Sequence, residues 1–264
     1  MKSVDTNSAG AALRNHDQLV TEQFGSTATA YLTSTVHSQG ADLQDIATYA
    51  QAFQQPVALD VGCGGGHASF ALAPHVAKVI AYDLAEEMLR VVAGAARERG
   101  LENLEVRQGS ADFLPFADAT FDLVCTRYSA HHWTNLPQAL AEMARVLKPG
   151  GKCIVVDTAS PDNVLADTYL QSIELLRDAS HVRNRSLPAW RELLSQAGFK
   201  VVSDKGWKLP LQFDSWVARM RTPTERVVAI KSLWDSAPSE VCSYFQLEAD
   251  YSFSIDSVMI TVEK

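Results

Sequence analysis

The chain has 264 residues, of which 47% are hydrophobic and 20% charged, and its formal net charge is −8. These proportions are ordinary for a soluble globular protein, and the length suits one sizeable α/β domain with a small insertion or cap. Because a negative field repels phosphate backbones, the charge argues against a nucleic-acid substrate and favours a small molecule.

No apolar run reaches the roughly 18 residues that a helix needs to cross a bilayer. The first residues also lack the apolar centre of a secretion signal, so we expect a cytoplasmic protein without a membrane span. The four cysteines are widely separated and form no CxxC pair. We therefore predict neither a disulfide framework nor a metal site.

In chain order, residues 13–53 have the spacing of two or three helices. From residue 56 to residue 158, short runs rich in Val, Ile and aromatic residues alternate with longer helical runs. The β-rich runs are 57–62, 78–84, 104–109, 121–128 and 152–158, and the helical runs between them are 67–76, 85–100 and 136–151. This alternation predicts a parallel sheet with helices on both faces and ligands outside the carboxyl ends of its strands.

The rest of the chain is expected to form a helical cap and two further strands. We predict mainly helix over 160–188, a helix at 188–197, a strand at 200–211, helices to about residue 234 and a terminal strand at 251–263. No linker rich in Pro or Gly separates these parts. We therefore predict one domain, 1–264, made of an N-terminal helical lid (1–54), a core (55–158) and cap helices with C-terminal strands (159–264).

The first predicted strand runs into a glycine-rich turn, Asp60-Val-Gly62-Cys-Gly64-Gly-Gly66. Glycine allows a tight turn and a close approach of a ligand to the main chain, although a lone glycine cluster also occurs without any ligand. A dinucleotide fingerprint, G-x-G-x-x-G, needs a glycine where this chain has His67, and the Lys-Ser or Lys-Thr of a phosphate loop is missing. The turn therefore matches neither fingerprint.

The second predicted strand ends at Asp83, 17 residues after Gly66. An acid at this place can accept hydrogen bonds from two ribose hydroxyls of a cofactor that lies over the first strand. It also suits the first turn of the next helix. We favour the ribose role because Asp83 ends the strand, but NAD enzymes use an acid likewise, so Asp83 alone does not separate the cofactors.

Three stretches together resemble the class I S-adenosylmethionine (SAM)-dependent methyltransferases, in the type 11 group that includes ubiquinone and menaquinone biosynthesis enzymes. They are the glycine turn at 60–66, the loop GSADFLPFADATFD at 109–122 and the turn RVLKPGG at 145–151. The resemblance covers about residues 56–158. It implies a Rossmann-like, doubly wound, mostly parallel seven-stranded sheet with helices on both faces and a helical cap. Ser110 departs from the family, which often has Asp there.

The resemblance also implies a SAM site. The glycine turn is expected under the methionine and ribose portion, Asp60 near the amino group and the residues after Gly109 against adenine. The residues expected to bind SAM are Tyr31, Asp60, Gly62, Cys63, Gly64, Asp83, Leu84, Met88, Ser110, Ala111, Asp112 and Arg127. Residues 13–31 are expected to form a lid with Phe24 and Tyr31 against SAM, although aromatic residues at this spacing are also ordinary core.

The expected activity is methyl transfer to a small-molecule acceptor by in-line displacement, with release of S-adenosylhomocysteine. Such an enzyme aligns the acceptor and excludes water, and it needs a base only when the acceptor loses a proton. In the loop 127–133 we select His131 as candidate base and substrate contact, with packing as the alternative. Arg183 and Arg219 are candidate substrate contacts in the cap, with plain surface charge as the alternative. The rival functions are an NAD(P)-dependent oxidoreductase and a SAM-binding protein without transferase activity.

Overall fold

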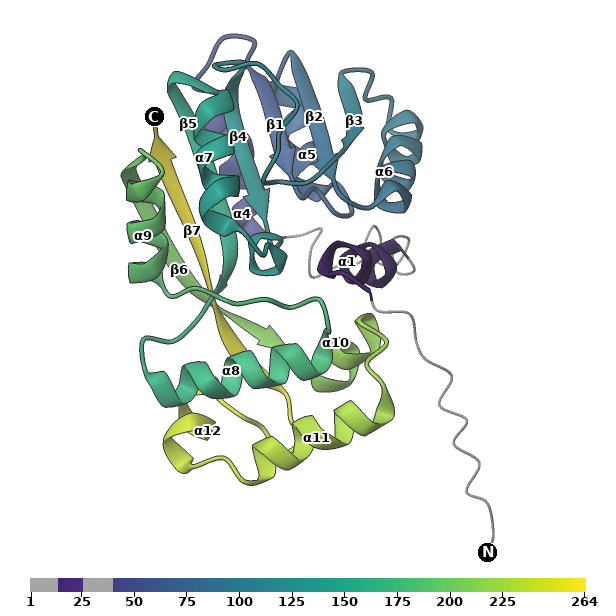
Figure 1. Ribbon diagram of the computed structural model, residues 1–264, viewed down its shortest axis with the longest axis vertical. Coiled ribbons are helices and arrows are strands. Elements are labelled where there is room, and N and C mark those ends of the chain that lie inside the picture. The colour runs from purple at the N-terminus through teal and green to yellow at the C-terminus, as the bar shows by residue number, and fades with distance from the viewer. Residues whose placement is uncertain (1–13, 26–39) are drawn as a thin grey trace, which may run out of the picture.

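The computed structural model describes residues 14–25 and 40–264 (Figure 1). A seven-stranded sheet in the order β3-β2-β1-β4-β5-β7-β6 forms its centre. The strands are β1 (Val57–Val61), β2 (Lys78–Asp83), β3 (Leu104–Gln108), β4 (Phe121–Arg127), β5 (Leu147–Ala159), β6 (Lys200–Leu211) and β7 (Phe253–Glu263). The first five are parallel, and β7 pairs antiparallel with β5 and β6. The predicted fold class is confirmed.

Helices cover both faces of the parallel strands. The helices are α1 (His16–Gly25), α4 (Ala41–Ala50), α5 (His67–Leu72), α6 (Glu86–Glu98), α7 (Leu136–Val146), α8 (Val164–Arg177), α9 (Leu187–Gln196), α10 (Phe213–Arg219), α11 (Thr224–Asp235) and α12 (Ser239–Phe245). On one face, Leu59 and Val61 of β1 belong to the core that includes residues of α7 and α9. On the other, Ala58 belongs to the core formed with α4 and α5. Because successive side chains of a strand point to opposite faces, a strand covered on both sides is mostly apolar.

The cap is built around the long ends of β6 and β7, which extend past the parallel strands (Figure 1). Helices α8, α10, α11 and α12 pack there around buried aromatic side chains, among them Trp216, Trp234 and Phe253. This packing explains how the cap is held beside the carboxyl ends of β4 and β5. The predicted strand at 200–211 is confirmed as β6, whereas helix α12 had not been predicted.

The prediction of helix over 160–188 is wrong for residues 178–186. Helix α8 ends at Arg177, and the chain then runs without regular helix to α9. The Asp178 carboxylate accepts hydrogen bonds from the backbone N–H of Ser180 (2.8 Å) and from its hydroxyl (2.6 Å). Such local side-chain bonds compete with the helical pattern and stabilise a turn. This segment, 178–186, later supplies polar groups to the site.

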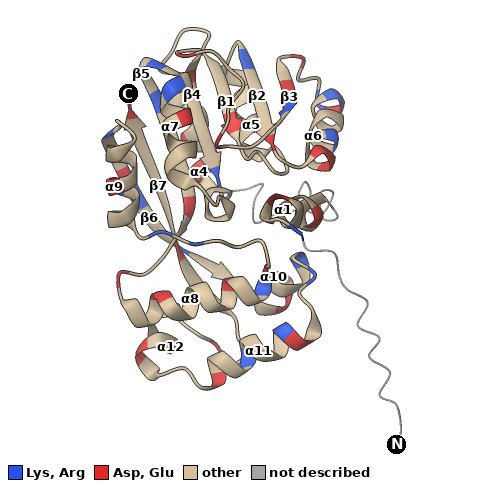
Figure 2. Cartoon of the chain, in the orientation of Figure 1, with Lys and Arg blue, Asp and Glu red and all other residues tan. Residues whose placement is uncertain are grey.

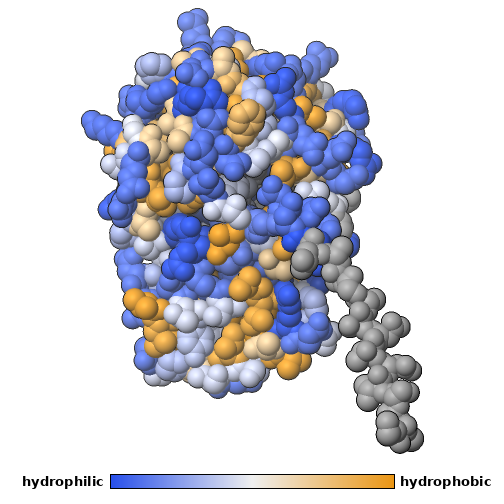
Figure 3. All heavy atoms as spheres, in the orientation of Figure 1, coloured by the Kyte–Doolittle hydropathy of each residue, from blue (hydrophilic) through white to orange (hydrophobic). Residues whose placement is uncertain are grey.

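The surface carries charges of both signs, interspersed over the helices in the view of Figure 2. In the same view, apolar side chains gather over the cap (Figure 3). The exposed apolar residues of cap helices α8 and α11 include Val164, Leu165, Leu175 and Val228. Among residues 14–25 and 40–264, no helix combines the length and apolar character needed to span a membrane.

Candidate active site

A large cavity lies at the carboxyl ends of β1, β2 and β4, where a doubly wound sheet binds its ligands. It offers about 1230 Å³ of space not filled by atoms, counting the part that is open to solvent. The glycine turn, the end of β2, the loop after β3, the segment after β4 and helix α1 form its walls.

The glycine turn presents bare main chain to this cavity. Gly62, Gly64 and Gly66 have φ values of +69°, +49° and +78°, which favour glycine. A Cβ atom on Gly62 would lie 2.0 Å from the Ser129 hydroxyl oxygen, whereas one on Gly64 would meet no heavy atom within 4 Å. The turn is held to β2 because the Gly62 and Cys63 N–H groups donate to the Tyr82 carbonyl (2.8 and 3.0 Å). A ligand can therefore approach the main chain at Gly64 without a side chain in its way.

Asp83 lies on the cavity wall with a partly exposed carboxylate. One oxygen accepts the Gly64 N–H (2.8 Å) and the other the Ala85 N–H (2.9 Å). Burial raises the pKa of Asp83, and these backbone donors oppose the rise. Since each carboxylate oxygen has a second lone pair, both can still accept a hydroxyl from a ligand. The bond to Ala85, which precedes α6, shows that Asp83 also serves the start of this helix.

Asp60, next to the last residue of β1, has a fully buried carboxylate that binds α5. It accepts the Ser69 N–H (3.0 Å) and the Ser69 hydroxyl (2.6 Å). Burial raises the pKa of Asp60 to about 6, although the bonds from Ser69 oppose the rise. Asp60 does border the cavity, but its described contacts hold β1 and α5 together.

The loop after β3 forms the opposite wall with Ser110, Ala111 and Asp112. The Ser110 hydroxyl donates to the Asp112 carboxylate, so an acid is present in this loop although Ser110 itself is not one. A Cβ on Gly109 would lie 1.9 Å from the Tyr82 hydroxyl oxygen, which explains the need for glycine there. The Tyr82 hydroxyl is within donating distance of the carbonyls of Ser110 (3.2 Å) and Phe113 (3.1 Å) and thereby holds the loop.

Arg127 borders the cavity, but its charge is already matched. Its guanidinium donates to both oxygens of Asp42 in α4, and the two side chains are only 6% and 4% exposed. The described contacts of the side chain bind α4 to the end of β4, and the expected contact of Arg127 with SAM stays a prediction. Asp42 is 85 positions away in the chain, so spacing could not reveal this pair.

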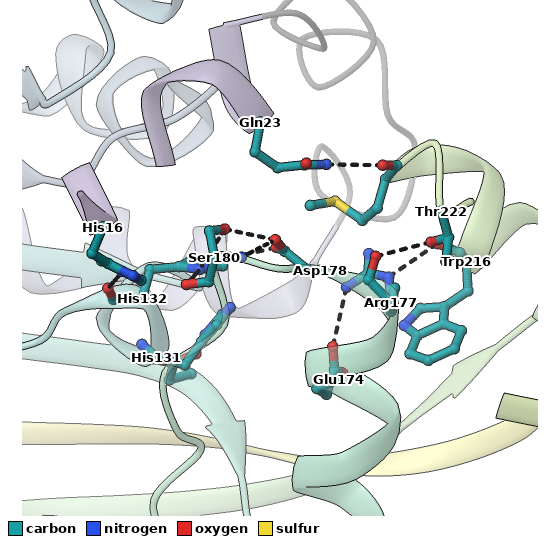
Figure 4. A network of polar contacts seen from close by, with 12 residues as sticks. His16, Gln23, His131, His132, Glu174, Arg177, Asp178, Ser180, Trp216 and Thr222 are labelled. Carbon is teal, nitrogen blue, oxygen red and sulfur yellow. Dashed lines mark hydrogen bonds and ion pairs between the residues drawn. The ribbon is translucent and has the colours of Figure 1, made fainter. Parts of the chain in front are cut away.

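Helix α1 reaches the cavity from the N-terminal part of the chain. His16, Val20 and Phe24 line the cavity, and the Phe24 ring packs edge-on against His132 with 4.9 Å between centroids. His16 Nε2 lies 2.9 Å from the His132 carbonyl oxygen, and the Gln23 amide donates to the Met220 carbonyl (2.8 Å). Helix α1 is thus joined both to the loop after β4 and to the cap (Figure 4). Tyr31 lies outside the described residues.

A second, smaller cavity adjoins the first, and both are lined by Phe24, Tyr128 and His132. It lies between the sheet and the cap and contains about 670 Å³ of space not filled by atoms. Its polar wall consists of His131, Thr158, Glu174, Arg177, Asp178, Asn184 and Arg219, and its apolar wall of Leu209, Leu211, Trp216 and Ile255. Tyr128, at the junction, has a φ of +49°, which is uncommon for a bulky residue and marks a strained position.

His131 forms a buried pair with Asp157 of β5. His131 Nδ1 lies 2.5 Å from one carboxylate oxygen, and the His131 backbone N–H donates to the other (3.1 Å). The Thr158 N–H also donates to Asp157 (2.8 Å), which is only 1% exposed. Burial lowers the pKa of His131, but the negative charge and hydrogen bond of Asp157 outweigh it, so that the net shift is upward.

The two other histidines near this pair are shifted in the opposite direction. Burial and the neighbouring His131 lower the pKa of His132 to about 4. They also contribute to lowering the pKa of His181 to about 2. His132 Nδ1 lies 3.0 Å from the Ser180 carbonyl, and His181 Nε2 lies 3.0 Å from the Gln171 amide oxygen. Of the three rings, His131 is therefore the one that the structure favours as a proton acceptor near neutral pH.

Arg177 stabilises the far wall of the second cavity through a network shown in Figure 4. Its guanidinium donates to Glu174 (3.2 Å) and to the Trp216 carbonyl (3.0 Å). The Thr222 hydroxyl donates in turn to the Arg177 carbonyl (3.0 Å). These bonds fix the end of α8 against α10 and shape the side of the cavity that faces the cap.

The predicted cofactor residues within the described ranges all line the larger cavity. Of the predicted substrate residues, His131 and Arg219 line the second cavity. Arg183 does not line either of the two cavities: its side chain is about half exposed and pairs with Asp167 (2.6 Å), so the surface-charge alternative fits it better. His16, Val20 and Asn184 were missed because no local pattern distinguishes them, and only the packing of α1 and of 178–186 brings them to the cavities.

Comparison with known proteins agrees with this geometry. A family model described as a methyltransferase domain matches residues 59–155. The chain is 48% identical over 203 residues to the uncharacterized protein YafE of Escherichia coli (strain K12), covering 77% of this chain and 98% of that protein. It is 34% identical over 242 residues to the uncharacterized methyltransferase YcgJ of Bacillus subtilis (strain 168), covering 90% and 96%.

The crystal structure of YcgJ shares the fold with a TM-score of 0.81, covering 85% of this chain and 98% of that one. A demethylmenaquinone methyltransferase of Lactococcus lactis subsp. lactis (strain IL1403) is 36% identical over 120 residues, covering 44% of this chain and 46% of that protein. The fold and the glycine-turn cavity define a Rossmann-like methyltransferase. The chain belongs to the family of SAM-dependent methyltransferases.

Proposed function

We propose that this enzyme transfers a methyl group from SAM to a small molecule held in the second cavity and releases S-adenosylhomocysteine. The observation that carries the proposal is the junction of the two cavities at Phe24, Tyr128 and His132. Two reactants bound on either side of this junction would meet directly, which is what in-line displacement requires. The name of the Lactococcus lactis relative, a demethylmenaquinone methyltransferase, supports a small-molecule acceptor.

The residues of the larger cavity fit SAM. Asp83 offers two carboxylate oxygens to vicinal ribose hydroxyls, and Gly64 leaves its main chain open to the methionine portion. Ser110, Ala111 and Asp112 provide polar and backbone groups for adenine. SAM supplies an activated methyl group on a sulfonium, so that the protein has to align the acceptor and exclude water. Phe24 and Val20 of α1 contribute the apolar cover at this point.

The test is calorimetric titration of the full chain with S-adenosylhomocysteine, SAM and NAD, on wild type and Asp83→Asn. We expect both adenosyl ligands to bind, and Asp83→Asn to weaken them by roughly tenfold to a hundredfold, since a hydrogen bond to a charged group contributes about 1.5–3 kcal/mol. Asn keeps the side-chain shape, and Asp118→Asn, an exposed residue of the same charge outside both cavities, is the control. Binding of NAD without either adenosyl ligand would refute the proposal.

A further inference from the structure

The atom of His131 that remains available is Nε2. Asp157 holds Nδ1, and this contact keeps a proton on Nδ1, so that the lone pair of the neutral ring lies on Nε2. The same carboxylate accepts the backbone N–H groups of His131 and Thr158, so the pair is held from both sides. Nothing in the described part of the chain forms a hydrogen bond with Nε2, and the ring lines the second cavity. An aspartate that orients a histidine in this way is the arrangement of a general base.

The charges around His131 support this role. The carboxylates of Asp157, Glu174 and Asp178 favour a protonated ring, and burial opposes it. The rings of His132 and His181 also lie close to His131, at centroid distances of 4.2 and 5.8 Å. Arg177 and Arg219 line the same cavity from α8 and α10, and Tyr128 lines it from the end of β4. The net upward shift of the His131 pKa makes it a stronger proton acceptor than a free imidazole.

A base in this position selects among acceptor atoms. A neutral amine already carries a free lone pair, and a carboxylate is already ionised at neutral pH. A phenol or an enol, with a pKa of about 10 like that of tyrosine, keeps its proton at neutral pH and becomes a good nucleophile only when it loses it. A His–Asp pair at the wall of an acceptor cavity is therefore most useful for a weakly acidic hydroxyl group.

Asn184 adds a second requirement on the acceptor. Its side chain lines the second cavity, is 1% exposed, and has no hydrogen-bond partner for Nδ2 or Oδ1. Its backbone is held in place by Gln171, which accepts the Asn184 N–H (3.1 Å) and donates to its carbonyl (3.0 Å). A buried amide without a partner is costly, so a ligand group with a donor and an acceptor side by side would match it. Trp216, Leu211 and Ile255 line the same cavity with apolar surface for a ring.

We propose that the acceptor is a phenol or enol with an adjacent polar substituent, that His131 Nε2 takes its hydroxyl proton, and that Asn184 binds the substituent. This inference rests on the proposed function and makes the enzyme an O-methyltransferase. The acceptor oxygen forms a bond to the methyl carbon while the carbon–sulfur bond breaks and its electron pair stays on sulfur. The proton on His131 then passes to solvent, and Asp157 is the positioning residue of the pair.

The experiment uses catechol (1,2-dihydroxybenzene) and acetylacetone (2,4-pentanedione), both of which keep their protons in water at neutral pH, as probes of the complete enzyme saturated with S-adenosylhomocysteine. Ultraviolet difference spectra report the ionised phenol or enol, and calorimetry reports binding. We expect wild type to bind at least one probe and to show the ionised form near neutral pH. His131→Gln should bind the probe with little loss, lack the ionised signal, and lose roughly a hundredfold or more of the rate of methyl transfer from SAM.

Three further variants sharpen this test. In Asp157→Asn, the pH at which the spectrum of the ionised probe first appears should differ from that of wild type. The variant should still unfold cooperatively on heating. Asn184→Leu should weaken binding of catechol by about tenfold, in line with a lost hydrogen bond of about 1.4 kcal/mol. His75→Gln, at an exposed histidine outside both cavities, should change none of these readouts.

The outcomes separate the two proposals. Failure to bind S-adenosylhomocysteine would overturn the proposed function. If that ligand binds but neither probe binds or ionises, only the hydroxyl acceptor is overturned. Methylation of 1,2-diaminobenzene at equal rates by wild type and His131→Gln, with no methylation of catechol, would overturn it in favour of a nitrogen acceptor.

Discussion

Left-handed backbone occurs in the glycine turn and at the junction of the two cavities. Gly62, Gly64 and Gly66 adopt it in the glycine turn, and Tyr128 adopts it at the junction with the second cavity. For a side chain other than glycine this conformation costs about 1–2 kcal/mol. The glycines avoid that cost, and Tyr128 bears it because its N–H donates to the Val156 carbonyl (2.8 Å) and its hydroxyl lies 3.1 Å from that of Ser257.

Two alanine substitutions in the glycine turn should have unequal effects on stability. Gly62→Ala combines backbone strain with overlap onto Ser129, whose hydroxyl oxygen and Cβ would lie 2.0 and 2.7 Å from the new atom. We expect a loss of about 2–5 kcal/mol, of which strain explains 1–2 and overpacking the rest. Gly64→Ala meets open space and should cost only the strain.

Urea denaturation of both variants measures the difference. The Gly64→Ala variant is the matched control, since it has the same change of residue in the same turn. Equal losses of stability in the two variants would show that the contact with Ser129 is not decisive.

At the scale of elements, an ion pair and a pair of backbone hydrogen bonds connect segments that are far apart in the chain. Arg127 joins the end of β4 to α4, and His131 accepts the N–H groups of Val182 and Arg183 through its carbonyl (2.9 and 3.1 Å). The second of these connections holds the segment 178–186 beside the loop after β4. Both connections therefore hold the walls of the two cavities in place.

Removing Asp42 should destabilise the fold strongly. Asp42→Ala leaves the Arg127 guanidinium buried without its counter-ion, and breaking such a pair costs about 3–5 kcal/mol. Asp204→Ala breaks a pair with Arg191, whose side chain is 52% exposed, and should cost less than about 1 kcal/mol. Thermal and urea unfolding compare the two.

The double variant Asp42→Leu with Arg127→Met tests whether the unpaired charge causes the loss of stability. With both charged groups replaced by apolar ones, it should recover much of the lost stability. If Asp42→Ala were as mild as Asp204→Ala, the pair would not hold α4 to β4 as described.

For the whole molecule, the buried histidines couple stability to pH. His132 and His181 stay neutral in the folded protein until the pH falls to about 4 and about 2, respectively, whereas both take up protons near 6.5 when unfolded. The unfolded chain thus binds more protons below pH 6.5, and stability falls as the pH decreases. His131 acts in reverse: its raised pKa contributes stability below pH 6.5 that is lost as the pH rises through the folded value.

Replacing His181 isolates one of these effects. In His181→Asn the acid-dependent loss should be smaller, so the difference in unfolding free energy between variant and wild type should change by about 1.4 kcal/mol per pH unit below 6.5. Urea denaturation at several pH values checks this, and the exposed His75→Asn should give a curve parallel to wild type. A parallel curve for His181→Asn as well would contradict the low pKa of His181.

The spacing of residues in the sequence was sufficient to predict those features that depend only on residues close together in the chain. The alternation of strands and helices, the glycine turn at 60–66 and the placement of Asp83 at a strand end all follow from local patterns, because strand ends and tight turns have local requirements. The alternation predicted a parallel sheet with helices on both faces, and the resemblance of the stretches 60–66, 109–122 and 145–151 to a known family predicted the full fold class and the family. The structure and the relatives confirm both.

The second cavity forms only when distant segments pack together, and this packing brings its lining residues to one place. His131 meets Asp157 across 26 positions, Arg127 meets Asp42 across 85, and Asn184 reaches the cavity only because α8 ends at Arg177. Such contacts arise when α4, the loop after β4 and the cap pack against the ends of the strands, and they leave no periodic signal in the chain. The glycine turn and strand ends of the larger cavity are thus encoded locally, whereas its cover by α1 and the whole second cavity exist only in the folded molecule.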